Sequence, residues 1–177
     1  MKRIKLYITV SAEGYIATPD GDLSWLVNYP MPSKEEHQVF LDSVDTVILD
    51  GDMYSNLVCM DILWPYKDKE VYVVSSHTVL TKNGVNFITE NVPERIADFK
   101  KATGKDIWLA GSADLISLLL DNDLIDEMII TYTPEVFEKG IALFSAPPEK
   151  SGWKLIENVS YNDTTLRKRY LPGQRPL

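Results

Sequence analysis

The chain of 177 residues has very few cysteines and histidines. It contains one cysteine, Cys59, and two histidines, His37 and His77. One thiol excludes an intramolecular disulfide and a multi-cysteine metal site, and neither H-E-x-x-H nor C-x-x-C occurs, so the sequence offers no ligand set for zinc. We expect Cys59 to be a small core residue and His37 a surface residue on a polar helix face. His77 follows a predicted strand, where a ligand can lie, although a structural role is the simpler interpretation.

The sequence also lacks a long apolar segment. No run of about 18 apolar residues occurs, so no membrane-spanning helix is predicted. The N-terminal segment "MKRIKLYITVSAEGYIA" has basic residues before an apolar run. That run is too short and too polar for a signal peptide, and it alternates as a strand does. These features predict a cytoplasmic protein.

Positive charge is scarce. Eighteen Lys and Arg residues face 26 Asp and Glu residues, and the net charge is -8. Because binding to nucleic acid requires a basic surface, nucleic acid is not expected as the main partner. The basic residues do cluster near the two ends, in Lys2, Arg3, Lys5, Arg167, Lys168 and Arg169. We expect these side chains to be solvent-facing charges on two neighbouring edge strands.

What the chain does have is an alternation of strands and helices. The apolar content of 45% is typical of a globular protein, and the length suits one domain over residues 1–177. Strands are predicted at residues 3–10, 46–49, 71–74, 85–88, 107–110, 126–133, 153–160 and 164–170. Helices are predicted at residues 34–43, from about 53, 93–102 and 112–121. This order predicts an α/β fold, with a mixed, mostly parallel central sheet, helices on both faces and a C-terminal antiparallel hairpin that turns at Asn162-Asp163.

Small and polar residues follow three of the predicted buried strands. They are Gly51-Asp52, Ser75-Ser76 and Gly111-Ser112. In an open α/β sheet, ligands bind outside the carboxyl ends of the strands, and glycine lets backbone N–H groups approach a ligand closely. The common phosphate fingerprints G-x-G-x-x-G and G-x-x-x-x-G-K-[ST] are absent, and so is the G-x-S-x-G elbow of acyl transfer. The pattern therefore indicates a phosphate-bearing ligand without a standard phosphate motif.

Five segments together carry a resemblance to a known family. The chain resembles the dihydrofolate reductase-like superfamily, in the branch similar to the reductase domain of bacterial bifunctional riboflavin-biosynthesis deaminase/reductase proteins. The segments are "SAEGYIATPDGDLSWL" (Ser11–Leu26), "VILDGDMY" (Val47–Tyr54), "WPYKDKEVYVVSS" (Trp64–Ser76), "GKDIWLAGSADLISLLLDNDLIDEMIITYTP" (Gly104–Pro134) and "GIALF" (Gly140–Phe144). Each is weak alone, but their order and spacing match the family across nearly the whole chain.

The resemblance implies a three-layer dihydrofolate reductase-like fold, NADPH as hydride donor, a small pterin- or pyrimidine-like heterocycle as substrate, and a homodimer. Ala17 would approach the nicotinamide, the turn at Gly51 would meet the pyrophosphate, Ser75 and Ser76 would face the adenosine ribose and its 2′-phosphate, and the turn at Gly111 would hold the diphosphate. The cofactor-binding residues implied are Ala17, Gly51, Asp52, Met53, Ser75, Ser76, Gly111, Ser112, Ala113, Asp114 and Leu115. The substrate-binding residues implied are Glu13, Tyr15 and Trp25. The zinc deaminase domain that accompanies the riboflavin enzyme is absent, so a complete riboflavin-pathway role is not expected.

Three residues depart from the family pattern. Asp52 stands where relatives usually have an arginine that holds cofactor phosphate, Ser112 stands where they have glycine, and Asp114 adds a carboxylate near a helix N-terminus. Two like charges about 4 Å apart repel by about 1 kcal/mol in water and by roughly 4 kcal/mol at an effective dielectric of 20. An enzyme therefore needs a compensating cation nearby, for which Lys82 and Lys100 are the candidates.

Two functional interpretations follow. The first is an NADPH-dependent reductase of a small heterocycle, similar to dihydrofolate reductase or to 5-amino-6-(5-phosphoribosylamino)uracil reductase. The second is a catalytically degenerate relative that binds a small molecule or a protein as a dimer. Glu13 also has two interpretations. It is a general acid with a raised pKa if it lies in an apolar cleft, or a loop carboxylate that caps the backbone of Gly14 or Tyr15.

Overall fold

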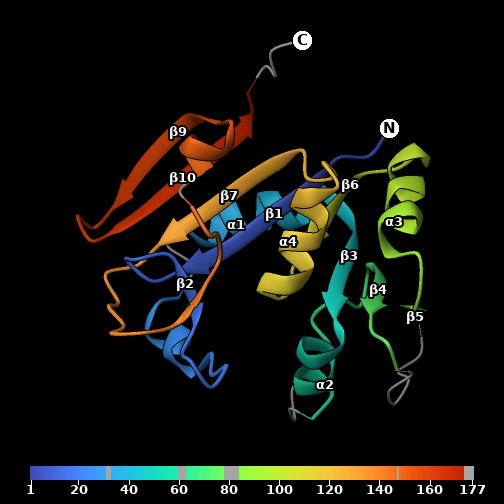
Figure 1. Cartoon of the computed structure of the whole chain (residues 1–177), viewed down its shortest axis with the longest axis horizontal. Helices are drawn as coiled ribbons and strands as arrows, with labels where there is room; N and C mark the ends of the chain where they lie inside the picture. The colour runs from blue at the N-terminus through green and yellow to red at the C-terminus, as the bar shows by residue number, and fades with distance from the viewer. Residues whose placement is uncertain (31–32, 60–62, 78–83, 147, 174–177) are drawn as a thin grey trace.

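The computed structural model describes residues 1–30, 33–59, 63–77, 84–146 and 148–173, and these form one large sheet with helices packed on it (Figure 1). The sheet has eight strands in the order β5-β4-β3-β6-β1-β7-β10-β9. Its strands are β1 Ile4–Val10, β3 Val44–Asp50, β4 Glu70–Val74, β5 Val85–Ile88, β6 Asp106–Leu109, β7 Glu127–Tyr132, β9 Trp153–Tyr161 and β10 Thr165–Pro172. A two-stranded ribbon pairs β2 (Tyr15–Ala17) with β8 (Ile141–Ala142).

The centre of the sheet is parallel. β1 pairs parallel with β6 and β7, β3 pairs parallel with β4 and β6, and β4 pairs parallel with β5. β10 runs antiparallel to both β7 and β9. The predicted mixed, mostly parallel sheet with a C-terminal hairpin is therefore confirmed. Because parallel strands end at the same edge, β1, β3, β4, β6 and β7 all deliver their following residues to one side of the molecule.

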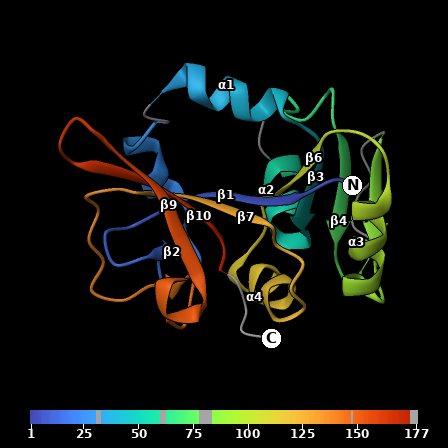
Figure 2. The same cartoon turned by 90° about the horizontal axis from the view of Figure 1, so that it is seen from above.

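Helices cover both faces of the sheet. The four α-helices of the described residues are α1 Lys34–Asp42, α2 Gly51–Cys59, α3 Val92–Lys101 and α4 Ala113–Asp121, and short 3-10 helices lie at η1 Ser24–Asn28 and η2 Pro148–Ser151. Tyr54 of α2 packs in one apolar cluster with Val47 and Leu49 of β3. Ile48 of β3 points the other way and packs with the residues of α3 and α4. Figure 2 shows α1 and α4 on opposite sides of the strands.

Local sequence signals explain several element boundaries. Ser33 precedes α1, and its hydroxyl accepts a hydrogen bond from the Glu36 amide at 3.2 Å, which confirms the N-cap half of the predicted capping box. The Glu36 carboxylate instead accepts from Tyr161 and Arg167. Asn162 and Asp163 have φ angles of 52° and 58°, the left-handed values that a tight two-residue hairpin turn needs. The helix predicted to begin near Met53 begins instead at Gly51, directly after β3. No loop separates β3 from α2, so the polar residues at that strand end belong to the start of a helix.

The clustered basic residues are not the free edge charges expected. β1 lies inside the sheet and β10 is not its neighbour. Lys2 and Lys5 are buried, and their ammonium groups pair with Asp45 at 2.6 Å and with Asp106 at 2.9 Å. The expectation was wrong because the acidic partners lie about 40 or more residues away in the sequence, where no local pattern reveals them.

Two further expectations are also corrected. Cys59 is exposed at the end of α2, so it is not a core residue. His37 is not a free surface histidine, since its ring stacks on the Tyr7 ring with centroids 5.8 Å apart. Burial lowers the pKa of His37, which keeps the imidazole neutral at physiological pH. Within the described residues, no helix is long and apolar enough to cross a bilayer.

Candidate functional site

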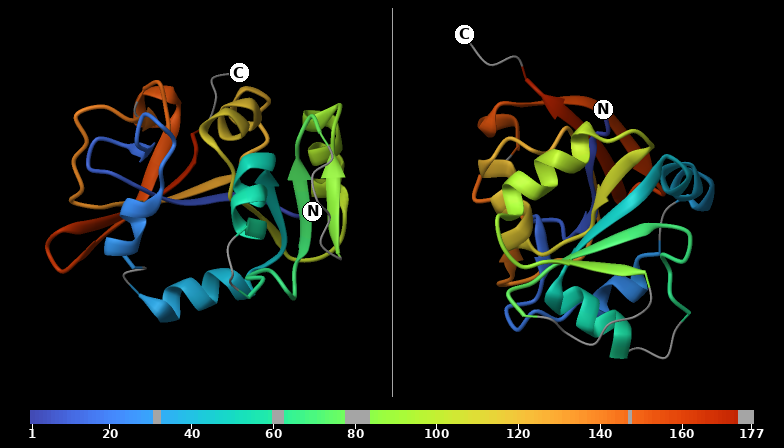
Figure 3. Two further views of the ribbon diagram at one scale, coloured as in Figure 1. Left: turned by 90° about the horizontal axis from the view of Figure 1, so that it is seen from below. Right: turned by 90° about the vertical axis from the view of Figure 1, so that its right-hand side faces the viewer.

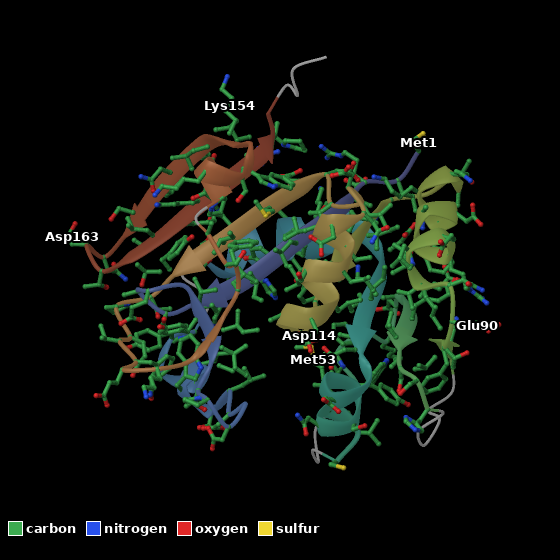
Figure 4. The ribbon with its side chains drawn as sticks, viewed as in Figure 1. Met1, Met53, Glu90, Asp114, Lys154 and Asp163 are labelled. Carbon is green, nitrogen blue, oxygen red and sulfur yellow. The ribbon has the colours of Figure 1, made fainter. Side chains whose placement is uncertain are left out.

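The predicted phosphate turn lies where β3 and β6 end side by side. β3 pairs with β6 in parallel, and the Ala110 amide extends this pairing by donating to the Ile48 carbonyl at 3.0 Å. α2 begins at Gly51, and α4 begins after its N-cap, Ser112. The amino ends of two helices therefore meet at one edge of the sheet, and Figure 4 shows the labelled residues Met53 and Asp114 there.

A carboxylate of the chain itself occupies this place. Asp50 is the last residue of β3, and its Oδ1 accepts a hydrogen bond from the Met53 amide at 2.9 Å. Its Oδ2 accepts another from the Ser112 amide at 2.6 Å. One anion is thus bound by the first turn of α2 and by the N-cap of α4, and we name the Met53 and Ser112 amides the cradle. The backbone fits an anionic group, because it already binds one.

The sequence did not single out Asp50 as a functional residue. Its place at the strand end was visible, but its second partner lies 62 residues further along the chain. Ser112 caps α4, and its hydroxyl accepts from the Leu115 amide at 3.5 Å. Asp52 and Asp114 lie in the first turns of α2 and α4, and both are exposed. The three carboxylates therefore gather at the two helix starts, where helix dipoles favour negative charge.

Packing within the chain explains both glycines of the turn. A β-carbon on Gly51 would lie 2.8 Å from the Ser75 hydroxyl oxygen, and one on Gly111 would lie 2.6 Å from a methyl carbon of Leu115. Neither glycine has a positive φ angle. Ser75 thus lies against the start of α2, so the structure brings the end of β4 next to the cradle. These close contacts favour glycine at both positions even without a ligand.

Ser75 and Ser76, the residues predicted to face the adenosine, follow the last residue of β4. The Ser75 hydroxyl oxygen accepts from the His77 amide at 3.2 Å, and the exposed Ser76 hydroxyl lies 2.7 Å from His77 Nδ1. Of the two candidate compensating cations, Lys82 lies outside the described residues. Lys100 lies at the opposite edge of the sheet, where it pairs with Asp126 at 2.7 Å near the first residue of β1. Lys100 is therefore wrong as a compensating cation for the cradle.

The predicted substrate residues cluster around the end of β1. The Ser11 hydroxyl donates to Glu13 Oε2 at 2.7 Å, and the Phe137 amide reaches the same oxygen at 3.5 Å. The buried Trp25 ring meets the Phe137 ring edge-on with centroids 5.3 Å apart. Tyr15 lies in β2 beside Ala142, and Ala17 in the same strand is buried. Glu13 and Trp25 are therefore joined through the loop that carries Phe137.

The expectation of a raised pKa for Glu13 is wrong. Desolvation is the largest single contribution and acts to raise the pKa of Glu13, but the hydrogen bonds to its carboxylate together outweigh it. The hydrogen bonds from Ser11 and from the backbone of Glu13 and Phe137 favour the ionised form and lower the pKa. The backbone contact expected in the alternative interpretation differs too, since the Tyr15 amide donates to the Ser11 hydroxyl rather than to Glu13. Glu13 is therefore an ionised carboxylate at neutral pH.

A polar cavity of about 260 Å³ lies next to these residues, at the ends of β1 and β7. The Tyr29 ring lines it and also contacts the Trp25 ring at a centroid distance of 6.1 Å. The cavity is lined by Thr9, Asn28, Tyr29, Pro30, Thr131, Thr133, Tyr161, Asn162 and Thr165. The neighbouring strands β3, β6, β1 and β7 are parallel, so their carboxyl ends lie at the same edge of the sheet. The cavity and the cradle therefore share that edge. Sequence reasoning missed the threonines, because alternation along a strand does not tell a cavity wall from a solvent face.

A second cavity of about 820 Å³ lies along α4 and extends to β8 and the start of β9. It shares only Ala113 and Asp114 with the predicted cofactor residues. Its lining contains Asp114, Asp121, Asp123 and Asp126 but no described Lys or Arg. Neither Met53 nor Ser112 lines this cavity, so its larger volume does not make it the better cofactor site.

Comparison with known proteins identifies the family. The model of the RibD C-terminal domain matches residues 2–163. The uncharacterized protein YwjB of Bacillus subtilis is 37% identical over 144 residues, which are 81% of this chain and 83% of that protein. A putative riboflavin biosynthesis protein from Shewanella sp. PV-4 superposes with a TM-score of 0.81 at 26% identity, over 97% of this chain and 99% of the other. Dihydrofolate reductase from Enterococcus faecalis, solved with NADP(H), has a TM-score of 0.69 at 13% identity, over 97% of each chain, which shows a shared fold.

Proposed function

The chain belongs to the RibD C-terminal domain family, and from this premise we propose that it is an NADPH-dependent reductase of a small pterin- or pyrimidine-like heterocycle. The observation that carries the proposal is the cradle, in which amides of α2 and α4 converge on one anion. Such a pair of helix starts is suited to the diphosphate of a dinucleotide. The match to dihydrofolate reductase adds that the fold accommodates a nicotinamide dinucleotide elsewhere.

The residues of this chain would divide the binding of the cofactor among the ends of β2, β3, β4 and β6. The amides of Met53 and Ser112 would hold the diphosphate, Ser75 and Ser76 would face the adenosine ribose, and Ala17 would lie against the nicotinamide. The bound cofactor would supply a hydride. Ser75 supports this arrangement, since it lies against Gly51 at the cradle.

The polar cavity is the candidate substrate site. Threonine, asparagine and tyrosine side chains in its lining can both donate and accept hydrogen bonds, as the edge of a pterin or pyrimidine requires. The Trp25 indole N–H is buried with no hydrogen-bond partner among the described residues, and its ring contacts the lining residue Tyr29. Glu13 is ionised, so in this proposal it accepts a hydrogen bond from the substrate rather than donating a proton.

The reductase proposal is tested by following NADPH oxidation with a panel of dihydropterins and aminopyrimidinones. The expected result is oxidation that depends on both the protein and one member of the panel. Thr131→Val removes one cavity hydroxyl and should raise KM, whereas Ser160→Ala, on an exposed part of β9, should leave the kinetics unchanged. NADPH oxidation that no substrate stimulates would contradict the proposal.

A second candidate function is a catalytically degenerate binding protein. Asp50 inside the cradle favours it, because a carboxylate already satisfies the amides that a phosphate would use. In either case we expect a homodimer, and light scattering of the purified chain tests this directly. A mass of one chain, 20.1 kDa, would contradict the expectation.

A further inference from the structure

Asp50 differs from the other two carboxylates at the helix starts in how it is held. Both of its carboxylate oxygens bind backbone amides, Met53 at 2.9 Å and Ser112 at 2.6 Å, and the residue is half-buried. Asp52 and Asp114 are exposed. Water screens the charges of Asp52 and Asp114, whereas Asp50 occupies the donors themselves.

The contact satisfies two helix ends with one side chain. The first amides of a helix have no partner within the helix and are satisfied by a side chain, by water or by a ligand. Asp50 caps α2 from the position before Gly51 and reaches across to the amide of the N-cap of α4. Hydrogen bonds from amides to a carboxylate are short and strong. The site is thus complete without a ligand.

A phosphate group that enters this cradle must displace Asp50. The phosphate needs the Met53 and Ser112 amides, and a carboxylate left between them would also repel it at short range. The displaced carboxylate must then find other partners or water. The cost is specific to ligands that place an anion between α2 and α4, and a ligand without one does not incur it.

We propose that Asp50 is a specificity-determining residue that acts as an internal competitor for phosphate at the cradle. The proposal rests on the proposed cofactor site, and it deepens that site by naming the residue that sets its affinity. In this account the chain binds nucleoside diphosphates weakly because the amides are already occupied, and not because the net charge nearby is negative.

The test compares variants of the full chain by calorimetric titration with ADP, a nucleoside diphosphate that carries no hydride. Asp50→Ser retains a hydroxyl that can cap α2 but is too short to bridge to Ser112. Asp50→Asn keeps the size and loses the charge. Asp52→Asn is the matched control, because it removes one exposed charge from the same helix start without vacating an amide. Thermal unfolding of each variant shows that it is folded before titration.

We expect Asp50→Ser to bind ADP at least about tenfold more tightly than the wild-type chain, and Asp50→Asn to show a smaller gain. Asp52→Asn should change the affinity by less than about threefold, as is usual for a solvent-screened charge. Equal gains in Asp50→Ser and Asp52→Asn would overturn the proposal, since charge rather than occupancy would explain them. Absence of ADP binding in every variant would also overturn it, since the cradle would then not bind phosphate.

Failure of the reductase proposal gives a different result. Tighter ADP binding in Asp50→Ser, together with no substrate-stimulated NADPH oxidation in any variant, would support Asp50 as an internal competitor in a binding protein. Tighter NADPH binding and faster oxidation at low NADPH in Asp50→Ser would support both proposals.

Discussion

At the scale of single residues, the ion pair of the buried Lys5 with Asp106 makes the stability of this chain depend on pH. Asp106 accepts from the backbone amide of Arg3 and pairs with the buried Lys5. Burial raises the pKa of Asp106, but the hydrogen bonds and the charges of Lys5 and Arg3 outweigh it, so the pKa lies below its usual value. A carboxyl whose pKa is depressed by folding adds stability above its unfolded pKa of about 3.9, and that stability disappears as pH falls through the folded pKa.

We predict that Asp106→Asn destabilises the chain by about 3 kcal/mol at neutral pH, because it leaves Lys5 buried without its counter-charge. The loss of stability below about pH 4 should also become shallower in this variant. Urea unfolding at several pH values measures both effects. The control Asp98→Asn breaks the exposed pair with Lys101 and should cost no more than about 0.5 kcal/mol. Equal losses in the two variants would contradict the account.

The second prediction at this scale concerns cofactor choice. Ser76 is exposed at the end of β4, where the proposal places the 2′-phosphate of NADPH. Ser76→Glu should therefore abolish the preference for NADPH over NADH, since a carboxylate repels a phosphate at hydrogen-bonding distance. Competition titrations with the two cofactors measure the preference, and Ser160→Glu on β9 is the control of equal charge. An unchanged preference in Ser76→Glu would remove Ser76 from the proposed site.

At the scale of elements, the contact between β4 and the start of α2 is tight. A β-carbon on Gly51 would lie only 2.8 Å from the Ser75 hydroxyl oxygen. We predict that Gly51→Ala destabilises the chain by roughly 1–3 kcal/mol through overpacking. Adding Ser75→Gly removes the clash and should restore part of the loss, which thermal or urea unfolding of the single and double variants would measure. Absence of any rescue would show that the cost arises from another contact.

Elements with local signals were predictable from the sequence, and contacts between distant elements were not. The Ser33 N-cap, the Asn162-Asp163 turn and the alternation of strands and helices depend on residues close in the chain, and the structure confirms them. The bridge from Asp50 to Ser112 and the pairs of Lys2 and Lys5 join residues far apart. The sequence shows that these groups exist but gives no distance between them.

At the scale of the molecule, one edge of the sheet carries every part of the candidate site. The left panel of Figure 3 shows α2 and α4 near the middle of the strands, with the β9–β10 hairpin at one end and β4 and β5 at the other. The sheet order places the cradle at β3 and β6 and the polar cavity at β1 and β7. The segments that form the cradle were predicted from motifs that resemble a known family. The residues that line the polar cavity lie in four separate parts of the chain, and the sequence did not predict that they meet.

The most direct measurement is a titration of the purified chain with NADPH at low salt, followed by tryptophan fluorescence and repeated with NADH. The account predicts saturable binding that is tighter for NADPH than for NADH and that tightens in Asp50→Ser. No binding of either cofactor up to millimolar concentration, in the wild-type chain and in Asp50→Ser, would contradict the reductase proposal.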